Sequence, residues 1–178
     1  MHTQQALLLN RHQRNLLTYI DGTMLGNIVG AGVYVNPKCT SPDGLSTRSG
    51  KTYPMGHQME AYDAELYGIQ QAAEHALQHC KRIRRKRVVW IFTDNQAAFM
   101  RIRPLKPGPG QEISIVLAHI STELTTLKCT LTTQWVPDTL MWPRMKKLTD
   151  SQLATTQRPP ATFRTSLSYL KRVARPKV

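Results

Sequence analysis

Cysteines are scarce in this chain of 178 residues, and their scarcity excludes two kinds of scaffold. Only three occur, far apart and without C-x-x-C spacing: Cys39, Cys80 and Cys129. An odd number of widely spaced cysteines argues against a disulfide framework or a structural zinc site, and it fits a reduced compartment. We therefore expect an intracellular protein, nuclear or cytoplasmic.

Long apolar runs are also missing. No stretch approaches the roughly 20 apolar residues that a membrane-spanning helix needs. The N-terminus has one short apolar run and no cleavage pattern, so we predict no secretory signal. Aromatic residues make up only 7% of the chain, whereas eleven prolines and ten glycines indicate substantial loops. We expect one domain at 15–157, between an N-terminal extension (1–14) and a basic, proline-containing tail (158–178).

Acidic residues are few, and the resulting charge is the strongest signal in the composition. The chain has 11 Asp and Glu residues against 24 Lys and Arg residues, which gives a formal net charge of +13. Such an excess favours polyanionic partners through electrostatic steering and counterion release. Nucleic acid is the default partner, although charge alone does not separate it from an anionic membrane surface or a ribosome-like assembly. We predict a nucleic-acid partner and no membrane association; the sequence does not fix the oligomeric state, and a monomer is favoured.

The apolar periodicity predicts a mixed α/β sheet. Strands are predicted at 16–21, 27–35, 88–92 and 128–136, with a weaker one at 51–57. Helices are predicted at 60–80, 97–102 and 111–124, with a possible one at 146–156. The unbroken apolar run at 88–92 is typical of a strand covered on both faces in a parallel sheet. Asp21-Gly22-Thr23 predicts a turn that ends the first strand.

Three acids stand out by their positions. Asp21 and Asp94 each sit at the carboxyl end of a predicted strand, and ligands of open α/β sheets bind at the carboxyl ends of strands. Glu65 lies on the apolar stripe of the helix at 60–80, where a carboxylate is costly without a partner or a metal. Three carboxylates at one end of a sheet would repel one another without a cation, and Mg²⁺ prefers such oxygen ligands.

Each acid also has a structural interpretation. Asp94 could cap the short helix that follows it. Asp21, which precedes Gly22, could be a turn residue, and Glu65 could pair with an arginine. Spacing alone does not separate these interpretations from a metal site.

Five segments occur in the order that they have in ribonuclease H domains: TYIDGT (18–23), GAGVYV (30–35), YDAELYGIQQA (62–72), IFTDNQAA (91–98) and TQWVP (133–137). The resemblance covers residues 16–156 and is strongest to the domains of non-LTR retrotransposon polyproteins, especially fungal ones. It implies a five-stranded mixed sheet in the order 3-2-1-4-5, flanked by helices.

The resemblance also implies an activity. Asp21, Glu65 and Asp94 match the first three acids of the family's four-carboxylate site, and Asp150 in LTDSQLA resembles the fourth. These acids would hold two Mg²⁺ ions, for which Mn²⁺ can substitute, and hydrolyse the RNA strand of an RNA–DNA hybrid. The implied substrate contacts near the site are Gly22, Thr23, Asn95 and Gln96.

One segment departs from the family. Where the family has Gly-His after Trp-Val-Pro, this chain has Asp138 and Thr139, and no histidine follows. The family's histidine assists turnover, so an alternative is a degenerate domain that binds nucleic acid without cutting it. A second alternative is an integrase-like or exonuclease-like enzyme of the same fold, although integrases place their glutamate later than Glu65.

The basic run Lys81–Arg87 has three interpretations. It could grip phosphates, act as a nuclear localisation signal, or form a solvated helix end. The sequence does not choose among them.

Overall fold

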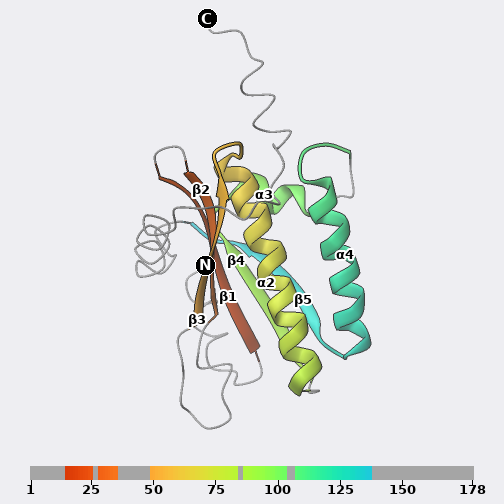
Figure 1. The fold of residues 1–178 in the computed structure, drawn as a ribbon. Helices are drawn as coiled ribbons and strands as arrows, with labels where there is room; N and C mark the ends of the chain where they lie inside the picture. Colours follow the sequence, from red (N-terminus) through yellow and green to blue (C-terminus); the bar gives the residue numbers. More distant parts are fainter. Residues whose placement is uncertain (1–14, 26–27, 36–48, 84–85, 104–106, 138–178) are drawn as a thin grey trace, which may run out of the picture.

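The computed structural model of the protein describes residues 15–25, 28–35, 49–83, 86–103 and 107–137 (Figure 1). Its elements are β1 (Asn15–Leu25), β2 (Ile28–Val35), β3 (Ser49–Gly56), α2 (Ala61–Ile83), β4 (Val88–Thr93), α3 (Gln96–Arg101), α4 (Gln111–Thr126) and β5 (Thr130–Trp135). Among the described residues, no helix is long and apolar enough to cross a membrane.

The five strands form one mixed sheet in the order β3-β2-β1-β4-β5. The first three strands pair antiparallel, whereas β4 pairs parallel to β1 and β5 pairs parallel to β4. The predicted fold class, a mixed sheet in the order 3-2-1-4-5 with flanking helices, is confirmed. Parallel pairing requires long crossovers, which α2 supplies between β3 and β4 and α4 between β4 and β5.

Helices α2 and α4 lie side by side across one face of the sheet, and α3 lies near the end where α2 begins (Figure 1). The face of α2 that meets the sheet is built from small and apolar side chains with no exposed surface, namely Leu66, Ile69, Ala72, Ala73 and Ala76. A Cβ built on Gly68 would lie 3.4 Å from Cβ of Ile20, so the helix backbone runs close to β1. Glu65 belongs to this buried face.

Aromatic rings occupy the opposite face of the sheet. Ile20 packs under α2, so strand alternation places Tyr19 on the other side. The Tyr19 ring stacks on Phe92 with centroids 5.0 Å apart, and Phe92 stacks on Trp90 at 6.2 Å. Phe92 is among the largest fully buried side chains, which agrees with the prediction of a strand covered on both faces.

The predicted turn at Asp21-Gly22-Thr23 is wrong. Strand β1 runs on to Leu25 and stays paired with β2 as far as Leu25 and Ile28. Asp21 therefore lies inside a strand and not at its end. The glycine that resembled a turn residue serves close packing instead, because a Cβ on Gly22 would lie 2.8 Å from the carbonyl oxygen of Ala61 in α2.

The other predicted elements agree with the structure to within two residues at each end, apart from the long helix, which runs to Ile83 and not to residue 80. The possible helix at 146–156, the N-terminal extension, the tail and the domain boundary at 157 lie outside the described residues.

Candidate active site

The register of the parallel strands β1 and β4 places Asp21 and Asp94 at the same end of the sheet, at corresponding positions relative to the two strands. Pairing between β1 and β4 ends at Tyr19 and Phe92, and each strand carries its acid two residues further on. Neighbouring strands lie roughly 4.8 Å apart, so continuing this register sets the two acids beside each other where the strands stop pairing. Asp21 is 8% exposed and Asp94 is half-buried.

Glu65 is set at the same end by the start of α2. The carboxylate of Asp63 accepts a hydrogen bond from the Glu60 backbone N–H at 2.8 Å, and the Glu60 carbonyl accepts from Ala64 N at 3.2 Å. This reciprocal arrangement resembles a capping box, with aspartate in place of the usual glutamate, and it fixes where the helix begins. Glu65 then lies in the second turn, directly above Gly22.

Both oxygens of Glu65 are held by the protein. The Gly22 backbone N–H donates to Oε1 at 2.6 Å, and the Thr93 hydroxyl donates to Oε2 at 3.0 Å. The side chain is only 3% exposed. These contacts tie α2 to β1 and to the end of β4, and Glu65 therefore does not need an arginine partner to satisfy its carboxyl group.

Asp94 does not cap the helix that follows it. Helix α3 is capped by Asn95, whose side-chain oxygen accepts from Ala98 N at 3.0 Å. The backbone carbonyl of Asp94 accepts a hydrogen bond from Nε1 of Trp135 at 2.9 Å. The structure thus removes the interpretation of Asp94 as the cap of α3.

The three carboxyl groups are close enough to perturb one another. The pKa of Glu65 is raised from 4.5 to about 8, first by burial and further by the charges of Asp94 and then Asp21. The hydrogen bonds from Gly22 and Thr93 oppose this rise because they stabilise the charged form. A cation held between these acids would reverse the balance and favour three ionised carboxylates.

The donor set suits a hard divalent cation. Carboxylate oxygens are the ligands that Mg²⁺ prefers, and each carboxylate offers about four lone-pair positions, so the two hydrogen bonds to Glu65 leave room for a metal. Within the described residues, no group of three His, Cys, Asp or Glu side chains already has the geometry of a formed metal site.

The residues predicted to contact the substrate differ from one another in burial and in hydrogen bonding. The Gly22 amide is engaged by Glu65, Thr23 is half-buried, Asn95 caps α3, and Gln96 is exposed. Their assignment as substrate contacts stays a prediction. Asp150, the proposed fourth acid, lies outside the described residues.

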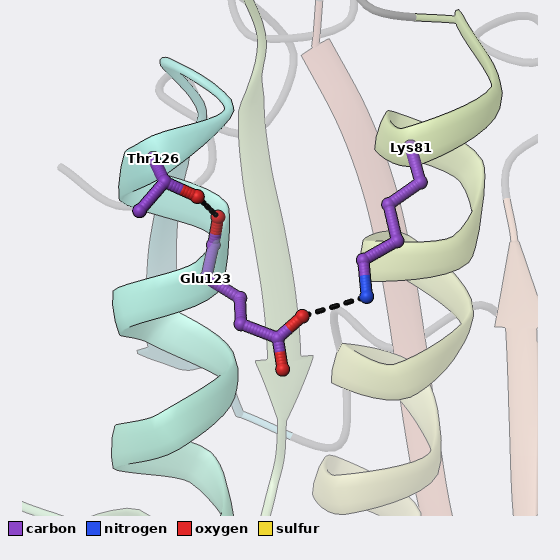
Figure 2. Close-up of polar contacts among 3 residues, drawn as sticks. All are labelled: Lys81, Glu123 and Thr126. Carbon is purple, nitrogen blue, oxygen red and sulfur yellow. Dashed lines mark hydrogen bonds and ion pairs between the residues drawn. The ribbon is translucent and has the colours of Figure 1, made fainter.

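The described part of the basic run lies far from the acids. Lys81 is in the last turn of α2, about 24 Å along the helix axis from Glu65. Figure 2 shows it paired with Glu123 of α4, Nζ to Oε2 at 2.6 Å, while Thr126 Oγ1 donates to the Glu123 carbonyl at 2.7 Å. Both charged side chains are about half exposed. For Lys81, these contacts favour a solvated helix end over a phosphate grip at the acids.

Comparison with known proteins identifies the fold. The chain is similar to ribonuclease H1 from Halobacterium salinarum (TM-score 0.55, 16% identity, covering 80% of this chain and 99% of that one). It is similar to LC11-RNase H1, solved in complex with an RNA/DNA hybrid (TM-score 0.58, 18% identity, covering 79% and 99%). The ribonuclease H domain of a Mycobacterium tuberculosis protein matches with a TM-score of 0.56 at 14% identity, covering 79% and 94%.

The chain therefore has the ribonuclease H fold. At these identities the likeness establishes the architecture and leaves activity to be argued from the site. No protein-family model matches the chain, and no curated protein matches its sequence.

Two residues that hold the site were not among those predicted. Thr93 contacts Glu65 through its hydroxyl, and Trp135 contacts the backbone of Asp94 through its indole nitrogen. A weak signal for Thr93 was present, since it is the first polar residue after an apolar strand. Nothing local in the sequence indicates the Trp135 contact, which joins residues 41 positions apart.

Proposed function

We propose that this protein is a metal-dependent endonuclease that cleaves the RNA strand of RNA–DNA hybrids. The observation that supports the proposal is that Asp21 and Asp94, which lie beyond the point where β1 and β4 stop pairing, are near enough to the buried Glu65 to raise its pKa. Three carboxylates so placed in a chain with few acids fit a cation site better than a structural role.

The roles of the acids follow from the resemblance to ribonuclease H domains. Asp21, Glu65 and Asp94 would hold the cation, and Asp150 would complete the set. When bound there, Mg²⁺ would supply activation of water and stabilisation of the leaving oxygen of the phosphodiester. The burial of Glu65 and its bonds to Gly22 and Thr93 keep that carboxyl group in one place, which is the protein's main contribution to a reaction that depends on alignment.

Hybrid recognition is supported by charge and by resemblance. LC11-RNase H1 was solved with an RNA/DNA hybrid, and the motifs of this chain resemble ribonuclease H domains of retrotransposon polyproteins. We extend this substrate to the present chain, with Gly22, Thr23, Asn95 and Gln96 as contacts. Acidic and basic residues are equal in number within the described ranges, so the excess of +13 is carried by the remaining segments. These segments would supply the salt-dependent affinity for phosphates.

The test is cleavage of a hybrid labelled on its RNA strand, in Mg²⁺ and in Mn²⁺. We expect metal-dependent loss of the RNA strand, no cleavage of duplex DNA, and no activity in Asp94→Asn. Glu123→Gln, which removes an exposed acid far from the site, is the matched control and should cleave normally. Salt-sensitive hybrid binding without cleavage would identify the protein as a binding domain whose altered loop at 138–147 has ended catalysis.

A further inference from the structure

The hydroxyl group of Thr93 links two of the three acid-bearing elements. Thr93 is the last residue of β4 and has no exposed surface. Its hydroxyl donates to Oε2 of Glu65 at 3.0 Å and accepts from the backbone N–H of Asn95 at 3.1 Å. The same oxygen therefore restrains the carboxyl group on α2 and the peptide that leaves Asp94.

Strand β5 restrains the Asp94 backbone from the other side. Nε1 of Trp135 donates to the Asp94 carbonyl at 2.9 Å, and the Val136 backbone N–H donates to the Thr93 carbonyl at 2.9 Å. Both carbonyls that flank the Asp94 amide and α-carbon are thus held by the neighbouring strand. Together with the Thr93 hydroxyl, these bonds leave the main chain at Asp94 little freedom.

We propose that Thr93 and Trp135 are positioning residues that set the separation of the Glu65 and Asp94 carboxylates for metal binding. The inference rests on the proposed function, since it assigns these acids to a cation. Each would act through the acid whose side chain or backbone it contacts, Thr93 through Glu65 and Trp135 through Asp94.

Packing alone does not account for a threonine at this position. The residues of β4 on the same face of the sheet, Val89 and Ile91, are apolar and fully buried. Valine has the shape of threonine and avoids the desolvation of a buried hydroxyl. The hydroxyl is thus useful here through its bonds to Glu65 and Asn95, which fix geometry around the acids. Partners of this kind, which orient the groups that bind a metal, typically change metal affinity by about 10- to 100-fold when removed.

The chain offers a matched control for each position. Thr18 is also buried on this face, and its hydroxyl has no hydrogen-bond partner among the described residues. The buried Nε1 of Trp90 has none there either. Thr18→Val and Trp90→Phe therefore repeat the chemical changes of Thr93→Val and Trp135→Phe without removing a bond to the site.

The experiment compares these four variants and Thr93→Ser with the wild-type chain. The first readout is the rise in melting temperature on titration with Mg²⁺ without substrate, which reports metal affinity by linkage. The second is kcat and KM on the labelled hybrid. For Thr93→Val we expect the Mg²⁺ midpoint to rise about 10-fold or more and kcat to fall about 100-fold, with KM within about 2-fold.

The remaining variants separate positioning from packing. Thr93→Ser, which keeps the hydroxyl, should stay within about 3-fold of wild type, and so should both controls. Trp135→Phe should follow Thr93→Val in direction with a smaller effect, since the Val136 bond remains. It also serves as the deciding variant if Thr93→Val does not fold.

Three outcomes would overturn the inference. Thr93→Val or Trp135→Phe with a wild-type Mg²⁺ midpoint and kcat would refute positioning while leaving the nuclease intact. Equal damage in Thr93→Ser, which keeps the hydroxyl, and in Thr93→Val, which removes it, would refute the assignment of the effect to the bonds of the hydroxyl. A wild-type chain that neither responds to Mg²⁺ nor cleaves the hybrid would remove the proposed function, and this inference with it.

Discussion

The Gly22→Ala substitution tests how closely helix α2 packs against strand β1 at the candidate site. A Cβ at this position would lie 2.7 Å from Cγ and from the backbone nitrogen of Glu65, and 2.8 Å from the Ala61 carbonyl oxygen. Ordinary contacts of a Cβ begin at 3.4 Å, so α2 must move by about 0.7 Å or more to relieve the overlap. Two of the three obstructing atoms belong to the helix backbone, and a rotamer change cannot relieve them.

The consequence for function should exceed the consequence for stability. Overpacking of this kind costs about 1–3 kcal/mol, and alanine recovers roughly 0.5–1 kcal/mol of the conformational entropy cost of glycine in a strand. The same movement stretches the 2.6 Å bond from the Gly22 amide to Glu65. A misplacement of about 1 Å at a catalytic group can lower a rate roughly 100-fold. We expect a folded protein with about 1–2 kcal/mol less stability and hybrid cleavage lowered about 100-fold.

Gly68→Ala is the control for this prediction. Gly68 also faces the sheet from α2, but there the new Cβ meets Ile20 at 3.4 Å, the distance of ordinary contact. Alanine is about 1 kcal/mol better than glycine inside a helix, so this variant should be at least as stable as wild type and equally active. Urea unfolding and initial cleavage rates measure both effects. Full activity in Gly22→Ala would refute the packing of α2 on β1 described above.

Three further predictions concern charge and core. In EDTA the free energy of unfolding should fall as pH rises from about 5 to 8, by up to a few kcal/mol, because folded Glu65, with a pKa of about 8, keeps a proton that the unfolded chain releases. Urea titrations at several pH values should show no such fall for Glu65→Gln; an identical slope would contradict the raised pKa. Lys81→Ala should change the free energy of unfolding by at most about 0.5 kcal/mol, because the pair with Glu123 is exposed, and a larger loss in urea unfolding would contradict this. Phe92→Ala should cost about 3–5 kcal/mol by the same measurement, since its buried ring stacks in the aromatic row, and a loss under 1 kcal/mol would indicate a loosely packed face.

Sheet order could be predicted, and the three acids could be nominated as a site, because the signals for both are local or motif-based. The apolar runs identify β2 and β4, the helical stripe identifies α2, and Asp21, Glu65 and Asp94 sit in segments that resemble one fold. The long-range contacts that join these segments could not be predicted from local signals. Asp-Gly-Thr has the composition of a turn, and only the passage of α2 above Gly22, which is close to Glu65 in space but 43 residues away in sequence, explains why the strand continues.

The N-cap of α3 likewise could not be predicted from the local sequence. Asp94 and Asn95 are both good capping residues, and the sequence favours neither. The structure assigns the cap to Asn95 because its side-chain oxygen reaches Ala98, while the Asp94 carbonyl is taken by Trp135. Long-range and local hydrogen bonds together, and not capping propensity alone, decide which of the two residues caps the helix.

The bonds that hold the site also determine when it forms during folding. They join residues 43, 28 and 41 positions apart, namely Gly22 to Glu65, Thr93 to Glu65 and Trp135 to Asp94. Contacts of such sequence separation are slow to form because the intervening chain must first be ordered. The β1–β2–β3 meander contains only one of the three acids. A nascent chain therefore cannot assemble the described site before β5 has been synthesised and has docked, so cleavage activity would report completion of the sheet.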